Sequence, residues 1–122
     1  MRILIIDDEP NIRRIVQMAL ALVDAMEVLE APSGTDGIRK ARESHPDAIL
    51  LDVMMPGLDG PSTLAALRSD PGTAAIPVIF LTAKAVLSEL EQLRDLGPAG
   101  VLTKPFDPMA LAGQVRAALR ES

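Results

Sequence analysis

The chain has 122 residues, a length typical of one domain, and carries a formal net charge of −5. This acidic balance lacks the basic surface that nucleic acids and anionic membranes require, and an aromatic content of 2% argues against a base-stacking surface. Because no apolar run approaches the ~18 residues of a membrane span and there is no cysteine, we expect a cytoplasmic domain with an aliphatic core, without disulfides, and with no direct contact with nucleic acid or membrane.

Short apolar runs alternate with longer amphipathic segments along the sequence. Each run has the length of a strand and lacks the polar alternation of a half-exposed strand, which predicts strands covered on both faces. The segments between the runs repeat apolar residues at helical spacing. In chain order the predicted strands are Ile3–Ile6, Glu27–Ala31, Ala48–Leu51, Pro77–Leu81 and Gly100–Thr103.

Residues that start or end helices lie between these runs. Pro10 suits a helix start, Ser33 and Asp59 can cap the second and third helices, and Pro61 is tolerated in a first turn. Gly97-Pro98 is expected to end the fourth helix. The alternation predicts an α/β fold in one domain spanning residues 1–122, with five parallel strands, right-handed crossovers and helices on both faces of the sheet.

Polar side chains follow four of the five predicted strands. Asp7 and Asp8 follow the first, Asp52 the third, Thr82 the fourth and Lys104 the fifth. Each alone has an ordinary interpretation as a turn residue, a helix cap or a surface lysine. However, ligands of such sheets bind beyond the carboxyl ends of the strands, so we expect all five side chains to share one edge.

The three carboxylates of this edge would raise one another's pKa unless a cation separated them. Mg²⁺ prefers oxygen ligands and often shares its shell with a phosphate, so we expect a magnesium site. A carboxylate beside Mg²⁺ can attack phosphorus and form an acyl phosphate. Lys104 and the metal would then neutralise the phosphoryl oxygens, and Thr82 would donate a hydrogen bond to one of them.

The same stretches carry a family resemblance. The chain has "DDEP" after the first strand, "LLDVMMPGLDG" around the third, "LTA" after the fourth and "LTKPF" after the fifth. In this order and spacing it resembles the receiver domains of two-component response regulators, over essentially the whole chain, and among them those similar to the chemotaxis regulator. The resemblance implies a flavodoxin-like (βα)5 fold with strand order 2-1-3-4-5.

The resemblance also implies roles for the acidic residues. Asp52 is expected to accept the phosphoryl group from a histidine kinase or a histidine phosphotransfer protein. Asp8 is expected to bind Mg²⁺ directly, Asp7 mainly through water, and the backbone carbonyl of Met54 would complete the protein ligands together with Asp52.

The remaining site residues are expected to convert phosphorylation into a signal. Lys104 would pair with the phosphoryl group, and its bond to Pro105 is expected to be cis. Thr82 would move toward the phosphate and change the surface formed by the fourth helix, fifth strand and fifth helix. We expect a monomer or a weak dimer through this surface. The output partner stays open, because the sequence does not separate a stand-alone receiver acting on a protein target from a domain excised from a protein with a fused effector.

Two departures from the family pattern lead to hypotheses. Val101 stands where receivers often have an aromatic residue, so we expect the signal to travel by movement of the loop after Thr82 rather than by a ring rotation. Met54 and Lys84 stand at the positions that usually tune the lifetime of the acyl phosphate. A thioether does not position water and a lysine screens charge, so we expect a comparatively long-lived phosphorylated Asp52.

Residues outside the motifs have simpler interpretations. His45 is interpreted as a surface loop residue and Met55 as a packing residue. Arg13 and Arg14 are interpreted as a solvated face of the first helix, with contact to an acidic partner as the alternative, since the first helix and the loop before the last helix dock onto the kinase in similar proteins.

Two other functions are possible on a similar sheet. A Mg²⁺-dependent phosphohydrolase with an aspartyl nucleophile commonly has an acidic residue two positions after the nucleophile, where this chain has Met54, and a cap over its substrate, whereas the loops here are short. A flavin-binding module would have a glycine-rich phosphate loop after the first strand, where this chain has two acids. We therefore expect a signalling switch that is not an enzyme beyond its own phosphotransfer and slow dephosphorylation.

Overall fold

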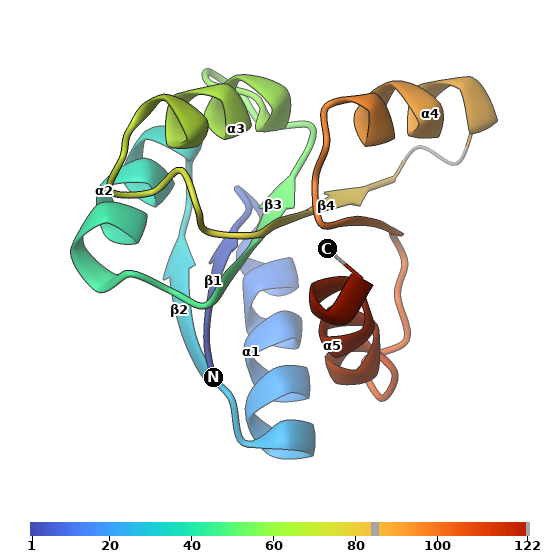
Figure 1. Cartoon of the computed structure of the whole chain (residues 1–122). Coiled ribbons are helices and arrows are strands. Elements are labelled where there is room, and N and C mark those ends of the chain that lie inside the picture. Colours follow the sequence, from blue (N-terminus) through green and yellow to red (C-terminus); the bar gives the residue numbers. More distant parts are fainter. Residues whose placement is uncertain (84–85, 122) are drawn as a thin grey trace.

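The fold was analysed in a computed structural model that describes residues 1–83 and 86–121. Within these residues five strands and five helices alternate along the chain (Figure 1). The strands are β1 (Arg2–Ile6), β2 (Glu27–Ala31), β3 (Ala48–Asp52), β4 (Val78–Thr82) and β5 (Gly100–Thr103). The helices are α1 (Pro10–Asp24), α2 (Gly34–Ser44), α3 (Gly60–Ser69), α4 (Leu87–Asp95) and α5 (Leu111–Glu121).

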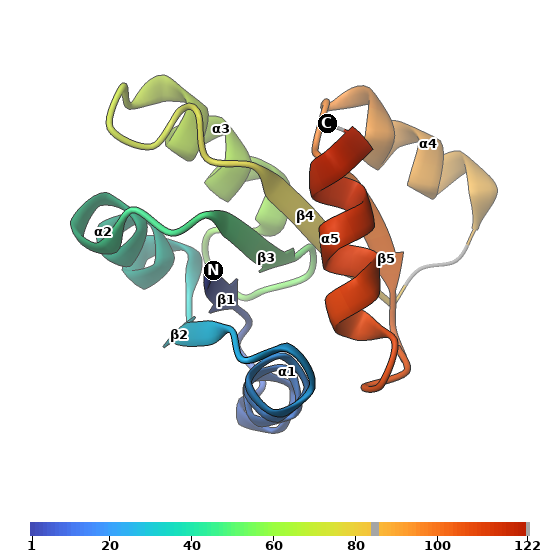
Figure 2. The same ribbon diagram turned by 60° about the horizontal axis from the view of Figure 1, so that its bottom comes forward.

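The strands form one parallel sheet in the order β2-β1-β3-β4-β5. The predicted fold class and strand order are thereby confirmed, and the bounds of the strands differ from the prediction by no more than one residue at either end. Helices α2 and α3 lie together on one side of the strands, whereas α1 and α5 lie together on the other (Figures 1 and 2).

Two aliphatic cores hold these layers together. Side chains of a strand point alternately to the two faces, so Ile3 and Ile5 of β1 pack toward α1 and α5, while Leu4 and Ile6 pack toward α2 and α3. All four are fully buried, and each contributes about 1.5–3 kcal/mol by leaving water. Among the described residues Phe80 is the largest fully buried side chain, and the next largest are all Ile or Leu, in line with the expected aliphatic core.

The helix caps follow the sequence signals. The side chain of Ser33 accepts a hydrogen bond from the Asp36 amide, and that of Asp59 accepts one from the Ser62 amide. Helix α4 ends at Asp95, and Gly97 then adopts a left-handed backbone conformation with φ +74°. Among the described helices, none is both long and apolar enough to cross a bilayer.

The register of the sheet brings the carboxyl ends of β1, β3, β4 and β5 to one edge. Ile6 pairs with Leu51, so the residues that follow them in sequence, Asp7 and Asp52, lie side by side. Thr82 pairs with Thr103, which places Lys104 immediately beyond Thr82. The fold therefore assembles one site from four segments that are far apart in sequence.

Candidate phosphoacceptor and cation site

Asp7 is the most buried of the three acids of the site. Its residue is fully buried, and both carboxylate oxygens accept a hydrogen bond. One comes from the Glu9 amide at 2.9 Å and the other from Lys104 Nζ at 2.8 Å. Asp8, by contrast, is half-buried and accepts no hydrogen bond from any residue that the structure describes. Asp7 is thus held by the protein, whereas the Asp8 carboxylate is open to a ligand.

Asp52 ends β3 beside Asp7 and is 4% exposed. One carboxylate oxygen accepts hydrogen bonds from Lys104 Nζ at 3.2 Å and from the Met54 amide at 3.4 Å. Within the described part of the chain, the other oxygen has no hydrogen-bond partner. Burial, and then the charge of Asp7, raise the pKa of Asp52 to about 6, although Lys104 opposes both effects. At neutral pH Asp52 is therefore a carboxylate with one oxygen free to react.

Lys104 bridges the two carboxylates. Its side chain is 12% exposed, and the bond between Lys104 and Pro105 is cis. Burial alone would lower the pKa of Lys104, but the hydrogen bond to Asp7 and the charges of Asp7 and Asp52 raise it above its ordinary value. The ammonium group thus stays charged and offsets part of the repulsion between the acids.

The donor set fits a small divalent cation. Carboxylate oxygens of Asp7, Asp8 and Asp52 all lie within 4.8 Å of one another. Three carboxylates against one ammonium leave the cluster with excess negative charge, and hard oxygen ligands of this kind are those that Mg²⁺ prefers. Since Lys104 occupies one oxygen of Asp7 and one of Asp52, the oxygens available to an ion are those of Asp8 and the second oxygen of Asp52.

Gly60 lets the segment after β3 turn back tightly. The Gly60 amide donates a hydrogen bond to the Val53 carbonyl at 3.0 Å. A Cβ atom at Gly60 would lie 2.6 Å from the Asp52 carbonyl oxygen and 2.7 Å from Val53 Cα. Both are backbone atoms, so only glycine fits without moving the strand end that carries Asp52.

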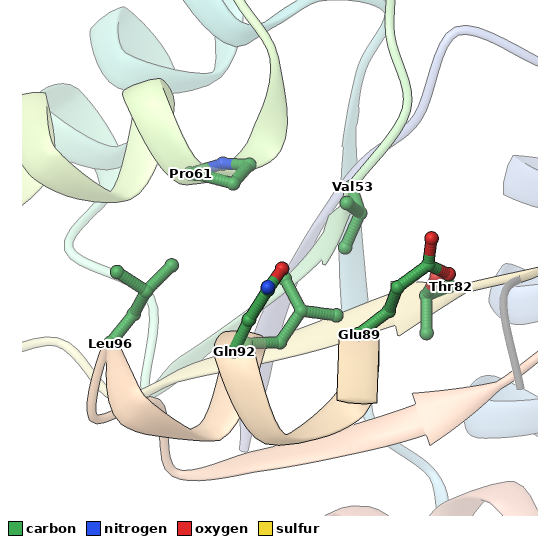
Figure 3. Close-up of a pocket in the computed structure, with 7 residues that line it drawn as sticks. Val53, Pro61, Thr82, Glu89, Gln92 and Leu96 are labelled. Carbon is green, nitrogen blue, oxygen red and sulfur yellow. The ribbon is translucent and has the colours of Figure 1, made fainter. Parts of the chain in front are cut away.

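Thr82 is fully buried at the end of β4. Its carbonyl accepts a hydrogen bond from the Lys104 amide at 2.7 Å, which joins the ends of β4 and β5. Its side chain lines a cavity of about 300 Å³ between α4 and the start of α3 (Figure 3). Val53, Pro61 and Glu89 line the same cavity, and Figure 3 shows the Glu89 side chain extending from α4 toward Thr82.

Helix α4, which lines one side of this cavity, is weakly anchored. Among its residues only Leu93 is buried, whereas Leu87 is 64% exposed. The N-cap residue Val86 is 60% exposed and makes no side-chain capping hydrogen bond. Few buried contacts and an uncapped start are features of segments that move at low free-energy cost.

One interpretation from the sequence is wrong. Arg13 is not on a solvated face: its side chain is 17% exposed, donates a hydrogen bond to the Asp7 carbonyl at 2.8 Å and pairs with Glu30 at 3.3 Å. Arg13 and Arg14 are adjacent cations at the start of a helix, and helical spacing alone does not show that Arg13, unlike Arg14, faces the loop after β1. Arg14 is exposed, as predicted.

The other residues of interest have clear positions. His45 is exposed and ends α2 with φ 47°, and Met55 is buried in the core on the α2 and α3 side. Val101 packs against the same core, and the Met54 side chain is 60% exposed. Lys84 lies outside the described residues.

Comparison with known proteins identifies the family. The profile described as "Response regulator receiver domain" matches residues 3–116. The DNA-binding dual master transcriptional regulator RpaA of Synechocystis sp. is 41% identical over 121 residues, which cover 99% of this chain and 50% of RpaA. Protein PilG of Pseudomonas aeruginosa is 35% identical over 96% of this chain and 86% of PilG.

Solved structures agree with these sequence matches. The chemotaxis response regulator CheY4 of Vibrio cholerae superimposes with a TM-score of 0.88 at 28% identity, over 96% of this chain and 97% of CheY4. The chain spans about half the length of RpaA and of the probable transcriptional regulators ycf27 that it also matches. From its fold, its acidic edge and these matches, the chain belongs to the response regulator receiver domain family of two-component signalling.

Proposed function

We propose that the chain is a phosphorylation-controlled switch in which Asp52 takes a phosphoryl group from a phosphohistidine of a partner protein. The open carboxylate oxygen of Asp52 forms the new bond to phosphorus, the bond from phosphorus to the imidazole nitrogen breaks, and that nitrogen keeps the electron pair. The observation that carries this proposal is the Asp52 carboxylate itself: buried, ionised at neutral pH, fixed at one oxygen by Lys104 and open at the other.

We propose that Asp8, Asp52 and the backbone carbonyl of Met54 hold Mg²⁺ directly, with Asp7 contributing through water. When bound, the ion neutralises developing charge on the transferring phosphoryl group. Lys104 stays protonated and exchanges its contact with Asp52 for one with a phosphoryl oxygen. The Asp52 oxygen that Lys104 releases then faces the ion, while the other Asp52 oxygen carries the phosphoryl group. Asp7 keeps its own hydrogen bonds from Lys104 and from the Glu9 amide, so the loop that carries Asp7 and Asp8 stays in place.

The switch itself would be carried by Thr82 and α4. A phosphoryl group adds about −1.5 to −2 charge units. Moving a two-state equilibrium from 1:99 to 99:1 takes about 5.5 kcal/mol, and charge-assisted hydrogen bonds from Lys104, Thr82 and backbone amides supply about 1.5–3 kcal/mol each. The weak anchoring of α4 makes the surface of α4, β5 and α5 the place where this free energy produces movement.

The phosphodonor is proposed to be a histidine kinase or a histidine phosphotransfer protein, since histidine kinases phosphorylate receiver domains. Exposed apolar side chains on α1 and on the loop before α5 offer a docking surface, lined by Ile15, Met18, Leu22, Pro108 and Met109 around a groove of about 320 Å³. The expectation of no direct nucleic-acid contact applies to this acidic domain alone. RpaA, a regulator described as DNA-binding, is about twice as long, so an output through such a domain is compatible with this proposal.

The test is labelling with radioactive acetyl phosphate, with and without a magnesium chelator. The proposal predicts at most one label per chain, loss of the label in Asp52→Asn and in chelator, and no sustained release of phosphate. Continuous turnover of small phosphate esters would instead favour the phosphohydrolase, and labelling that survives both Asp52→Asn and chelation would refute the proposal. Because Met54 has no group that positions water strongly, decay of the label within seconds would also contradict the expected lifetime.

A further inference from the structure

The peptide that joins Asp7 to Asp8 is anchored by a side chain from another element. The Asp7 amide donates to the Ala31 carbonyl of β2 at 3.1 Å, which continues the sheet by one residue. The Asp7 carbonyl accepts a hydrogen bond from Arg13 Nη1 at 2.8 Å. This second contact fixes the plane of the peptide between the two acids, and therefore the direction in which Asp8 leaves the backbone.

The two acids depend on this peptide to different degrees. The Asp7 side chain has its own partners, Lys104 and the Glu9 amide. Asp8 has none within the described residues, so its carboxylate is oriented only through its backbone. Loss of the contact to the Asp7 carbonyl would therefore disturb Asp8 more than Asp7.

Arg13 is itself held in place. It lies in the first turn of α1, its side chain is largely buried, and its Nε atom pairs with Glu30 of β2 at 3.3 Å. One planar guanidinium thus ties the loop after β1 to the neighbouring strand, with one nitrogen on the carbonyl and another on the carboxylate. A lysine ammonium lacks this rigid planar fork, so it would not hold the carbonyl and the carboxylate together in one fixed arrangement. Arg14, the next residue, is exposed and forms no hydrogen bond or ion pair with the residues that the structure describes.

We propose that Arg13 is a positioning residue for the cation site: by holding the Asp7–Asp8 peptide it orients Asp8 toward the ion. The inference rests on the proposed function, because it takes the acid cluster to be the magnesium site. Groups that orient metal ligands without touching the metal change its affinity by about 10- to 100-fold when removed.

The direction of the change in Mg²⁺ affinity distinguishes a positioning role of Arg13 from the effect of its charge. Arg13 is a cation close to a site for another cation, so by charge alone its removal would tighten Mg²⁺ binding. By positioning, its removal weakens Mg²⁺ binding. The two explanations predict opposite changes, and Arg14→Ala removes the same charge from the neighbouring residue as a matched control.

The experiment is an NMR titration of isotope-labelled protein with Mg²⁺ alone, which needs no phosphodonor; the chain has no Trp or Tyr for a fluorescence readout. We expect Arg13→Ala to weaken Mg²⁺ binding by about 10-fold or more. Arg14→Ala is expected to bind Mg²⁺ as the wild type does or slightly more tightly. Unchanged or tighter binding by Arg13→Ala would overturn the inference.

A charge-conserving pair keeps the test decisive if Arg13→Ala does not fold. Arg13→Lys retains the charge and is expected to bind Mg²⁺ more weakly than Arg14→Lys, and equal affinities would overturn the inference. The wild type distinguishes the two levels of the argument: failure of the wild type to bind Mg²⁺ refutes the proposed cation site, whereas normal wild-type binding with unaffected Arg13 variants refutes only the role of Arg13.

Discussion

Replacing Asp52 with Asn is expected to stabilise the metal-free protein at neutral pH. In the folded protein the pKa of Asp52 is raised from 3.8 to about 6, first by burial and then by the charge of Asp7. A carboxyl group whose folded pKa lies above its unfolded value takes up protons on folding between those two values, so stability falls as pH rises through this range and the full cost applies above about pH 6. Asn is nearly isosteric and still accepts a hydrogen bond from Lys104 but carries no charge.

The magnitude follows from the shift. About 2.2 pH units at 1.36 kcal/mol each give a cost of about 3 kcal/mol at pH 7.5, which falls to about 0.5 kcal/mol at pH 4. Asp52 is only 4% exposed, so solvent screening reduces this little. Urea unfolding of the wild type and Asp52→Asn, at both pH values and in chelator, measures the difference.

Magnesium provides the internal control. An ion that binds the folded state stabilises it by mass action. Mg²⁺ should therefore stabilise the wild type more than Asp52→Asn and reduce the difference between their free energies of unfolding. A variant no more stable than the wild type at pH 7.5, or a stability gap that does not change between pH 7.5 and pH 4, would refute the reasoning about the buried carboxylate.

Three further predictions concern the surroundings of the same carboxylate. Lys104→Met removes a charge-assisted hydrogen bond of about 1.5–3 kcal/mol, so we expect the pKa of Asp52 to rise further in a carboxyl-carbon NMR titration, and labelling to slow by at least about 10-fold; an unchanged titration would contradict this. Gly60→Ala forces a Cβ atom against backbone, so we expect the free energy of unfolding to fall by about 1–3 kcal/mol in thermal unfolding and labelling to slow. A labelling rate equal to that of the wild type would show that the segment relaxes freely. Glu89→Gln removes a negative charge from the cavity beside Thr82 and should speed labelling by up to about fivefold, whereas Glu91→Gln on the exposed side of the same helix should not; equal effects would show that only net charge matters.

Periodicity predicted most of the fold. Runs such as Ile3–Ile6 are too short for helices and too uniformly apolar for half-exposed strands. Their length and composition therefore predicted a sheet that is covered on both faces. The caps Ser33 and Asp59 marked helix starts because each side chain satisfies a free amide of the first turn. The strand order came from the resemblance to receivers, since spacing along the chain does not fix which strands are neighbours.

The proximity of the acids and Lys104 was predictable from the sequence, but their contacts with one another were not. The rule that parallel strands end at one edge brought Asp7, Asp52 and Lys104 together. It did not show that the Lys104 ammonium bridges the two acids, because that depends on the register between strands and on side-chain geometry. Arg13 was misinterpreted for a related reason: its partners are a backbone carbonyl and Glu30 of another strand, and neither leaves a pattern near Arg13 in the sequence.

The most direct test of the central claim is to locate the phosphoryl group chemically. Protein incubated with acetyl phosphate and Mg²⁺ is treated with borohydride, which reduces an acyl phosphate and marks the residue that carried it, and the digest is read by mass spectrometry. The account predicts that the mark falls on Asp52 alone and disappears when magnesium is chelated. A mark on Asp7 or Asp8, or a mark on Asp52 of equal yield without magnesium, would contradict it.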